Sequence, residues 1–245
     1  MDRAKKRVKA DARGRAMAWL FLLCALLASL LGLTLQRGLY QSYLFEMSTI
    51  KDTPQGLARQ YDFASLFLLY EAIPRALNGD LDVLRLNVRD LDGQERQAFN
   101  DREIAHMADV AHLYCLAKVV LAASALALIG FVLWNWRRVK RGESRAGIAK
   151  GALLGVLDVL LLAGAVALWA VIDFRSAFWA FHLIAFTNDL WLLDPNDMLI
   201  QMMPQAFFES TVLKIALNWA CCAAVWCAYW HGVLCRERKK AGAKA

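Results

Sequence analysis

The sequence predicts an all-α membrane protein with four transmembrane helices and two extracytoplasmic segments that form a site at the membrane interface. Hydrophobic residues make up 59% of its 245 residues, and the mean hydropathy is +0.36. That is too apolar for an ordinary soluble domain of this length. The apolar residues also lie in long blocks, and a helix needs roughly 20 such residues to cross a hydrocarbon core about 30 Å thick.

Four stretches are long and apolar enough to span the membrane: residues 17–35, 112–136, 152–172 and 211–234. The first follows a basic start, residues 1–16, that resembles the n-region of a signal peptide. Its apolar run is longer than a usual signal-peptide core of about 7–15 residues, and no small-x-small cleavage site follows it. We therefore interpret this first stretch as an uncleaved anchor.

The distribution of Lys and Arg predicts the orientation. Basic residues cluster in residues 1–16, in the connection 137–151 and in the tail 235–245. Basic loops resist translocation, so these parts are expected in the cytoplasm, and segments 36–111 and 173–210 on the outer face of the cell membrane. The net charge of +7 is then mostly cytoplasmic. It favours attraction to anionic lipid over nucleic-acid binding, because no pattern of a basic and aromatic groove accompanies it.

The cysteines give no indication of an outer-face disulfide. Cys235 lies at the cytoplasmic end of the fourth span, and the other five lie inside predicted spans: Cys24, Cys115, Cys221, Cys222 and Cys227. No C-x-x-C motif occurs. The adjacent Cys221 and Cys222 are therefore interpreted as small apolar packing residues rather than a redox pair.

The first outer segment, 36–111, is predicted to be mostly helical. The stretch "SLFLLYEAIPRAL" has apolar residues three and four positions apart, whereas "NGDLDVLRLNVRDLDGQ" alternates as in a short strand or hairpin. In "FNDREIAHMADVAHLY", Asn100 can cap a helix and Glu103 can return a bond to the cap. This helix is expected to run unbroken into the second span.

Three chemically active side chains share one face of that helix, just above the membrane. Glu103, His106 and Asp109 have i, i+3, i+6 spacing, and His112 lies near the same stripe. An isolated carboxylate in such a place usually belongs to a solvated helix face. On pattern alone, His106 fits a structural role as well as a functional one.

The second outer segment, 173–210, is expected to extend the third span with a helix rich in aromatic residues, as is typical at the headgroup level. Helical spacing would place His182, Phe186 and Asp189 on one face, with Asn188 and Trp191 nearby. Polar residues at membrane depth are costly, so they indicate a functional site when they pair.

That helix is expected to end before Pro195. Asp194 would then be the N-cap of a short interfacial helix, 196–208, with Pro195 at its first position and Asp197 three residues after the cap. The stretch "MLIQMMPQAFF" would give this helix a side of Met and Phe residues suited to the interface. We interpret Asp194, Asn196 and Asp197 mainly as turn and cap residues.

The chemistry that fits these residues best is proton transfer. His106 and His182 would face each other as an acid–base pair, with Asp109, Asp189 or Glu103 to orient them. The alternative is a mononuclear zinc site built from the same side chains. A di-metal site would need a second Glu-x-x-His motif, which the sequence lacks.

A transporter would need charges inside the spans. Lys118 and Asp158 are candidates, but they are expected to pair across helices or to snorkel. Four short spans with two chemically rich outer segments favour interfacial chemistry over conduction.

Two blocks of the sequence resemble the bacterial lipoprotein intramolecular transacylase family. Their matching residues are Arg102, Glu103, His106, Met107, Asp109 and Val110 in the first block, and Phe181, His182, Phe186, Asn188, Asp189, Trp191, Leu193, Asp194, Pro195, Pro204, Phe207 and Phe208 in the second. Departures are small: Asn100 and Asp101 stand where Thr-Glu is common, and Met203 where Phe is common. Neither departure touches a candidate catalytic position.

The resemblance implies transfer of the sn-2 acyl chain of the diacylglyceryl group to the α-amine of the N-terminal cysteine of bacterial lipoproteins. The product is an N-acyl, S-monoacylglyceryl lyso-form lipoprotein. His106 and His182 match the family's proposed histidine pair and would act as general acid and base. The supporting candidates are Glu103, Asp109, Asn188 and Asp189, with Asn188 or a backbone N–H before Pro195 as donor to the oxyanion.

Trp191, Met202 and Phe207 are candidates for substrate binding. Neither a metal nor a cofactor is expected, because nucleophile and electrophile lie on one molecule. The expected partners are diacylglyceryl-modified lipoproteins and membrane lipids, with no nucleic acid. The alternatives are a non-catalytic membrane adaptor and a metal-dependent membrane hydrolase.

Overall fold

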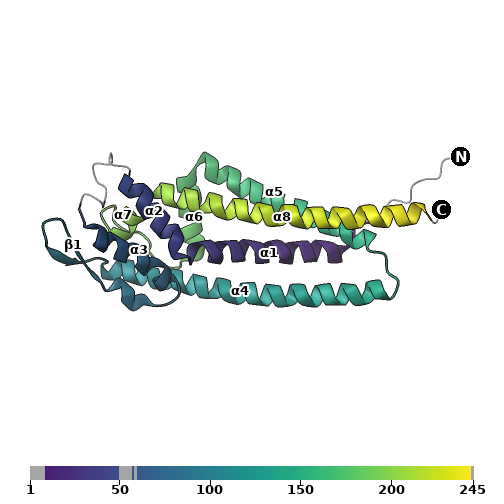
Figure 1. Ribbon diagram of the computed structural model, residues 1–245, viewed down its shortest axis with the longest axis horizontal. Helices are drawn as coiled ribbons and strands as arrows, with labels where there is room; N and C mark the ends of the chain where they lie inside the picture. Colours follow the sequence, from purple (N-terminus) through teal and green to yellow (C-terminus); the bar gives the residue numbers. More distant parts are fainter. Residues whose placement is uncertain (1–8, 50–56, 58–59, 244–245) are drawn as a thin grey trace. The chain divides into compact units, whose positions relative to one another are not determined.

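The computed structural model describes residues 9–49, 57 and 60–243, which are mostly helical (Figure 1). The basic residues Arg3, Lys5, Lys6 and Arg7 lie outside this range. The elements, in chain order, are α1 (Ala12–Thr34), α2 (Arg37–Thr49), α3 (Phe63–Leu77), the 3-10 helix η2 (Leu81–Leu84), β1 (Asn87–Arg89), β2 (Glu95–Gln97), α4 (Asp101–Lys140), α5 (Ala146–Ile172), α6 (Phe174–Ala185), α7 (Met198–Met202) and α8 (Gln205–Gly242).

Four of the described helices, α1, α4, α5 and α8, are long and apolar enough to cross a membrane. Each overlaps one of the four spans predicted from the sequence, which confirms the predicted fold class. The helix bounds do not fix where the membrane begins and ends, so the span limits stay predictions.

The chain forms two compact units. The first unit comprises Met1–Ser29, Val119–Ile172 and Ala216–Ala245, and the second comprises Leu30–Lys118 and Asp173–Ile215. Helices α1, α4 and α8 each contribute residues to both units.

Close backbone contact joins α1 and α5 in the first unit. A methyl group built on Gly151 would overlap the carbonyl oxygen of Asp11, and one built on Gly14 would overlap that of Ile148. Small residues are the usual means by which membrane helices approach this closely. On α8, Trp226 stacks on Phe21 with ring centroids 4.3 Å apart.

Two charged residues within the predicted spans each have a polar neighbour in their own unit. Asp158 lies 3.7 Å from Arg15, and the Lys118 ammonium donates to Asn78 Oδ1 at 2.8 Å. The prediction that Lys118 and Asp158 pair across helices or snorkel stays a prediction, because the two residues belong to different units. All six cysteines are free, as the sequence indicated.

The second unit has its own hydrophobic core. Buried residues from α2, α3, η2, β1, α4, α7 and α8 form one cluster. Asp62 caps α3 by accepting from the Ser65 N–H at 2.7 Å, and the Tyr70 hydroxyl donates to the Met202 carbonyl oxygen at 3.0 Å. The α3 helix thereby holds α7 in the core.

A two-stranded antiparallel hairpin, β1–β2, follows η2, with Val88 opposite Arg96. This confirms the short hairpin predicted in this region. Gly93 lies in the turn with φ 84°, a backbone conformation that glycine adopts without strain.

The structure corrects the predicted extension of the third span. The helix breaks at Asp173, whose carboxylate accepts from the Ser176 N–H at 3.0 Å and begins α6 as a separate helix. Helix α6 then ends at Ala185, because Phe186 is extended with φ −124° and ψ 140°. Phe186 and Asp189 are therefore in a loop, and the helical spacing predicted for them is wrong.

The predicted interfacial helix 196–208 is also wrong. Asp194 makes a turn, in which its Oδ1 accepts from the Asn196 N–H at 2.8 Å. The N-cap of α7 is Asp197, and α7 ends at Met202 before Pro204. Residues 205–208 are the first turn of α8.

Candidate active site

The second unit brings His106 and His182 together. His106 lies in the second turn of α4 and His182 near the end of α6, and their ring centroids are 6.2 Å apart with an interplanar angle of 33°. His182 is the one residue of α6 that is buried, with 7% of its surface exposed. The two positions therefore have the proximity that a proton-transfer pair requires.

The tautomer of His182 follows from its hydrogen bond. Its Nδ1 lies 2.8 Å from the carbonyl oxygen of Phe178, one helical turn earlier. A carbonyl can only accept, so Nδ1 carries the proton and Nε2 keeps a lone pair. Burial lowers the pKa of His182, and the bond to Phe178 partly opposes this. His182 is thus a neutral imidazole with a basic Nε2.

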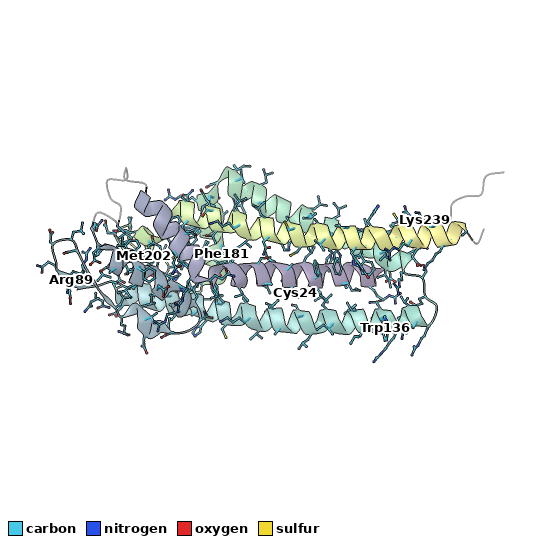
Figure 2. The ribbon with its side chains drawn as sticks, in the orientation of Figure 1. Cys24, Arg89, Trp136, Phe181, Met202 and Lys239 are labelled. Carbon is cyan, nitrogen blue, oxygen red and sulfur yellow. The ribbon has the colours of Figure 1, made fainter. Side chains whose placement is uncertain are left out.

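Aromatic rings surround His182. Phe178 lies 4.2 Å away between ring centroids, Trp191 5.0 Å, Phe181 5.3 Å and Phe186 5.5 Å. Phe181 is labelled in Figure 2. These rings keep water from the imidazole, which is the physical cause of the lowered pKa.

His106 is also held in its neutral form. Burial lowers its pKa to about 4, the neighbouring His182 adds to the lowering, and the charge of Asp109 opposes it. Its Nδ1 is buried and has no hydrogen-bond partner among the described residues. The edge of Phe186 lies against its ring, with centroids 5.2 Å apart. Near neutral pH both imidazoles are therefore uncharged.

The Glu103 carboxylate has a structural role, because both of its oxygens accept hydrogen bonds from backbone N–H groups. One carboxylate oxygen accepts from the Asn100 N–H at 2.8 Å, while Asn100 Oδ1 accepts from the Glu103 N–H at 2.9 Å, which confirms the predicted capping box. The other oxygen accepts from the Leu199 N–H at 2.8 Å. Burial raises the pKa of Glu103, and these N–H bonds partly offset the rise. Glu103 therefore joins α4 to α7.

The loop 186–191 holds the remaining polar candidates. Asn188 Nδ2 donates to Asp109 Oδ2 at 2.8 Å, and Asn188 Oδ1 accepts from the Leu190 N–H at 3.1 Å. The Trp191 Nε1–H donates to the Asn188 carbonyl oxygen at 3.0 Å. Asp189 is on the surface, and its carbonyl oxygen accepts from Arg102 Nη2 at 2.5 Å. These bonds lie within the loop and between the loop and α4, and the histidine rings are not among their partners.

Met202 and Phe207 lie in the core of the second unit. Met202, labelled in Figure 2, is 0% exposed. Phe207 packs against Tyr40 and Tyr43 at 5.7 and 5.0 Å between ring centroids. Their burial favours a packing role, and substrate binding by them stays a prediction.

Sequence reasoning missed two contributors to this site. Arg102 was noted only as part of a motif, although it binds the loop beside the histidines. Phe178 was not singled out, although its carbonyl sets the tautomer of His182. The spacing of four between Phe178 and His182 within a helix was the signal that could have identified that bond.

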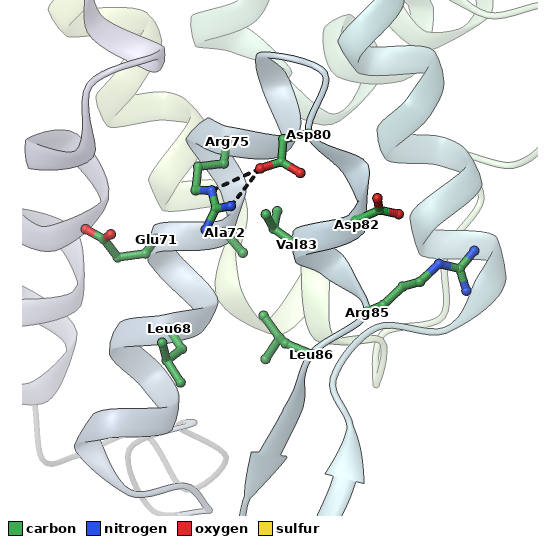
Figure 3. Close-up of a pocket in the computed structure, with 9 residues that line it drawn as sticks. All are labelled: Leu68, Glu71, Ala72, Arg75, Asp80, Asp82, Val83, Arg85 and Leu86. Atoms are coloured by element: carbon green, nitrogen blue, oxygen red, sulfur yellow. Dashed lines mark hydrogen bonds and ion pairs between the residues drawn. The ribbon is translucent and has the colours of Figure 1, made fainter.

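Two other features of the described residues bear on function. None of their His, Cys, Asp and Glu side chains form a group of three placed to hold a metal ion. An open pocket of about 440 Å³ lies between α3, η2 and the residues before β1, where Arg75 binds Asp80 at 2.7 Å (Figure 3). The pocket contains none of the predicted site residues.

Four of the described helices are apolar enough to define a multi-pass membrane protein, and its second unit holds two histidine rings close together. Residues 16–208 match the family model described as lipoprotein intramolecular transacylase Lit. The chain belongs to this family and is an acyltransferase, a lipoprotein transacylase.

Solved structures share the fold. The membrane integral lipoprotein intramolecular transacylase Lit from Bacillus cereus matches with a TM-score of 0.65 and 16% identity, over 93% of this chain and 96% of that chain. A variant of that protein with histidine replaced by arginine matches with a TM-score of 0.58 and 17% identity, over 94% and 92%. A histidine-to-alanine variant matches with a TM-score of 0.57 and 18% identity, over 93% of each. A comparison with curated proteins finds no match.

Proposed function

We propose that this protein transfers the sn-2 acyl chain of a diacylglyceryl-modified bacterial lipoprotein to the α-amine of its N-terminal cysteine. The product is an N-acyl, S-monoacylglyceryl lyso-form lipoprotein. The observation that carries the proposal is the pair of neutral imidazoles, His182 buried and His106 half-buried, with centroids 6.2 Å apart, in a chain that belongs to a transacylase family.

In this reaction His182 is the general base. Its Nδ1–H bond to Phe178 leaves Nε2 able to take a proton from the α-amine. As the proton leaves, the amine nitrogen attacks the carbonyl carbon of the sn-2 ester and forms a tetrahedral intermediate. Positioned proton transfer of this kind contributes about 10²–10⁴-fold in rate.

His106 is the general acid in the second half of the reaction. When the intermediate collapses, the bond between the carbonyl carbon and the glyceryl oxygen breaks. The oxygen takes a proton from His106 as His106 receives the proton that His182 gained from the amine, so neither imidazole becomes an anion. One amide N–C bond has formed, one ester C–O bond has broken, and no external reactant is consumed.

The site requires no covalent acyl-enzyme, because amine and ester are on the same substrate and need only be held together. We further propose that the site lies at the outer face of the cell membrane, with both termini in the cytoplasm. The cluster of basic residues in 137–151 and 235–245 supports that orientation.

Mass spectrometry of lipoprotein N-terminal peptides tests this function. Cells with the protein should contain the N-acyl, S-monoacyl form, and cells without it, or with His106→Ala or His182→Ala, should retain the S-diacyl form. An adaptor would keep its function in both variants and lose it with surface changes in 57–95. A metal-dependent hydrolase would carry stoichiometric zinc and lose activity with a chelator.

A further inference from the structure

Two residues of α4, one on each side of His106, hold the loop 186–191. Arg102 donates to the Asp189 carbonyl oxygen at 2.5 Å, and Asp109 accepts from Asn188 at 2.8 Å. Arg102 precedes His106 by four positions and Asp109 follows it by three, so all three lie along one face of the helix. The loop is therefore attached to α4 one turn before and one turn after the histidine.

The same loop contacts both histidine rings. Phe186 lies 5.2 Å from His106 and 5.5 Å from His182 between ring centroids. At the other end of the loop, the Trp191 ring lies 5.0 Å from that of His182. Because the Trp191 Nε1–H donates to the Asn188 carbonyl, the attachment at Asp109 extends through Asn188 and Trp191 to His182.

Among the described residues, the polar side chains of this attachment bind the loop and not the histidine rings. Neither Asp109 nor Asn188 is hydrogen-bonded to a histidine among the described residues, and the Asn188 side chain binds Asp109 and the Leu190 N–H. Arg102 binds the loop at Asp189 in two ways: it donates to the backbone carbonyl oxygen at 2.5 Å, and it lies 3.8 Å from the exposed carboxylate.

We propose that Arg102, Asp109 and Asn188 are positioning residues that clamp the loop 186–191 to α4 and thereby fix the separation of His106 and His182. The proposal rests on the proposed function, in which both histidines act on one substrate. Displacing a catalytic group by about 1 Å can cost about 100-fold in rate. Loss of the clamp is therefore expected to lower kcat while substrate binding through the acyl chains continues.

Two kinds of variant test the clamp: alanine variants of Asp109 and Asn188, and an exchange variant in which these two side chains trade places. The full-length protein is assayed in lipid with a diacylglyceryl-modified lipopeptide. Asp109→Ala and Asn188→Ala should each lower kcat about 10- to 100-fold, with KM changed by less than about threefold because ground-state binding is retained. The double alanine variant should lose no more than the worse single variant, because both break the same bond.

The pair Asp109→Asn with Asn188→Asp reverses donor and acceptor and keeps the hydrogen bond, so it should recover most of kcat. The matched control is Arg89→Ala, which breaks a 2.7 Å ion pair with Glu95 on the exposed hairpin and should leave kcat unchanged. If the exchange variant is as slow as Asp109→Ala, the Asp109 charge acts directly and the clamp is wrong.

Hydrogen–deuterium exchange measures how firmly the loop is held, and this measurement does not depend on acyl transfer. Backbone amides of residues 186–193 should take up deuterium faster in Arg102→Ala and Asp109→Ala than in the wild type. In the variant that combines Asp109→Asn with Asn188→Asp they should take it up at the wild-type rate. Unchanged exchange in Asp109→Ala would overturn the proposal. Faster exchange in a protein whose wild type transfers no acyl chain would support the clamp and contradict only the proposed function.

Discussion

At the scale of single residues, the surroundings of His106 and His182 keep both imidazoles uncharged near neutral pH. Burial and the neighbouring ring lower the pKa of His106 to about 4, and burial lowers that of His182. The Phe178 carbonyl then decides which nitrogen of His182 carries the proton. Two neutral imidazoles, with the tautomer of His182 defined, suit the proposed reaction, which moves one proton from an amine to a leaving oxygen.

The lowered pKa of His106 makes folding depend on pH. The unfolded chain has an ordinary histidine pKa near 6.5, so between about pH 6.5 and 4 it binds more protons than the folded protein. Stability is therefore full above about pH 6.5 and falls as the pH drops toward 4, by about 1–2 kcal/mol at pH 5.

This dependence can be measured by thermal unfolding in detergent. The fall in Tm between pH 7.5 and 5 should be smaller in His106→Gln, which cannot titrate, than in the wild type. An equal fall in both proteins would show that His106 is not buried as a neutral group.

At the scale of elements, the most accurate predictions concerned features formed by residues close together in the sequence. The capping box of Asn100 and Glu103 is made of residues three apart, so the sequence contains all of it. The break between α5 and α6 was missed, because "DF" within an apolar run can continue a helix or cap a new one. The same ambiguity produced the error at Asp194, since one side chain can cap a helix or close a turn.

Contacts between distant segments were only partly predictable. The facing of His106 and His182 was expected because the sequence predicts both histidines at the outer ends of their spans. The attachment of the loop to Arg102 and Asp109 was not, because no periodic pattern reports which helix a loop will meet. The predicted helix 196–208 failed because Pro204 separates α7 from α8.

The packing of α1 against α5 gives a prediction with an internal control. Gly151→Ala should destabilise the protein by about 1–3 kcal/mol, the usual cost of overpacking, because the new methyl group meets the Asp11 backbone. Gly164→Ala in the same helix should cost nothing and can gain up to about 1 kcal/mol of helix propensity, because nothing lies within 4 Å of it. Thermal unfolding of both variants in one detergent decides between them, and equal Tm values would contradict the packing.

At the scale of the whole molecule, the four apolar helices establish a multi-pass membrane protein, and the orientation is a prediction that labelling can test. In a background with the six native cysteines replaced by alanine, Leu91→Cys on the exposed hairpin should react with a membrane-impermeant maleimide in intact cells. Lys240→Cys near the end of α8 should react only after the cells are permeabilised. The reverse pattern would contradict an outer-face site.

The acyl transfer itself is tested most directly with purified protein and a synthetic S-diacylglyceryl lipopeptide that has a free α-amine. Mass spectrometry should show an N-acyl, S-monoacylglyceryl product of unchanged total mass with the wild type. With His106→Ala or His182→Ala its rate of formation should fall at least about 100-fold, the usual contribution of a general acid or base. Transfer at the wild-type rate by either variant would contradict the histidine-pair mechanism, and the absence of any transfer by the folded wild type would contradict the proposed reaction.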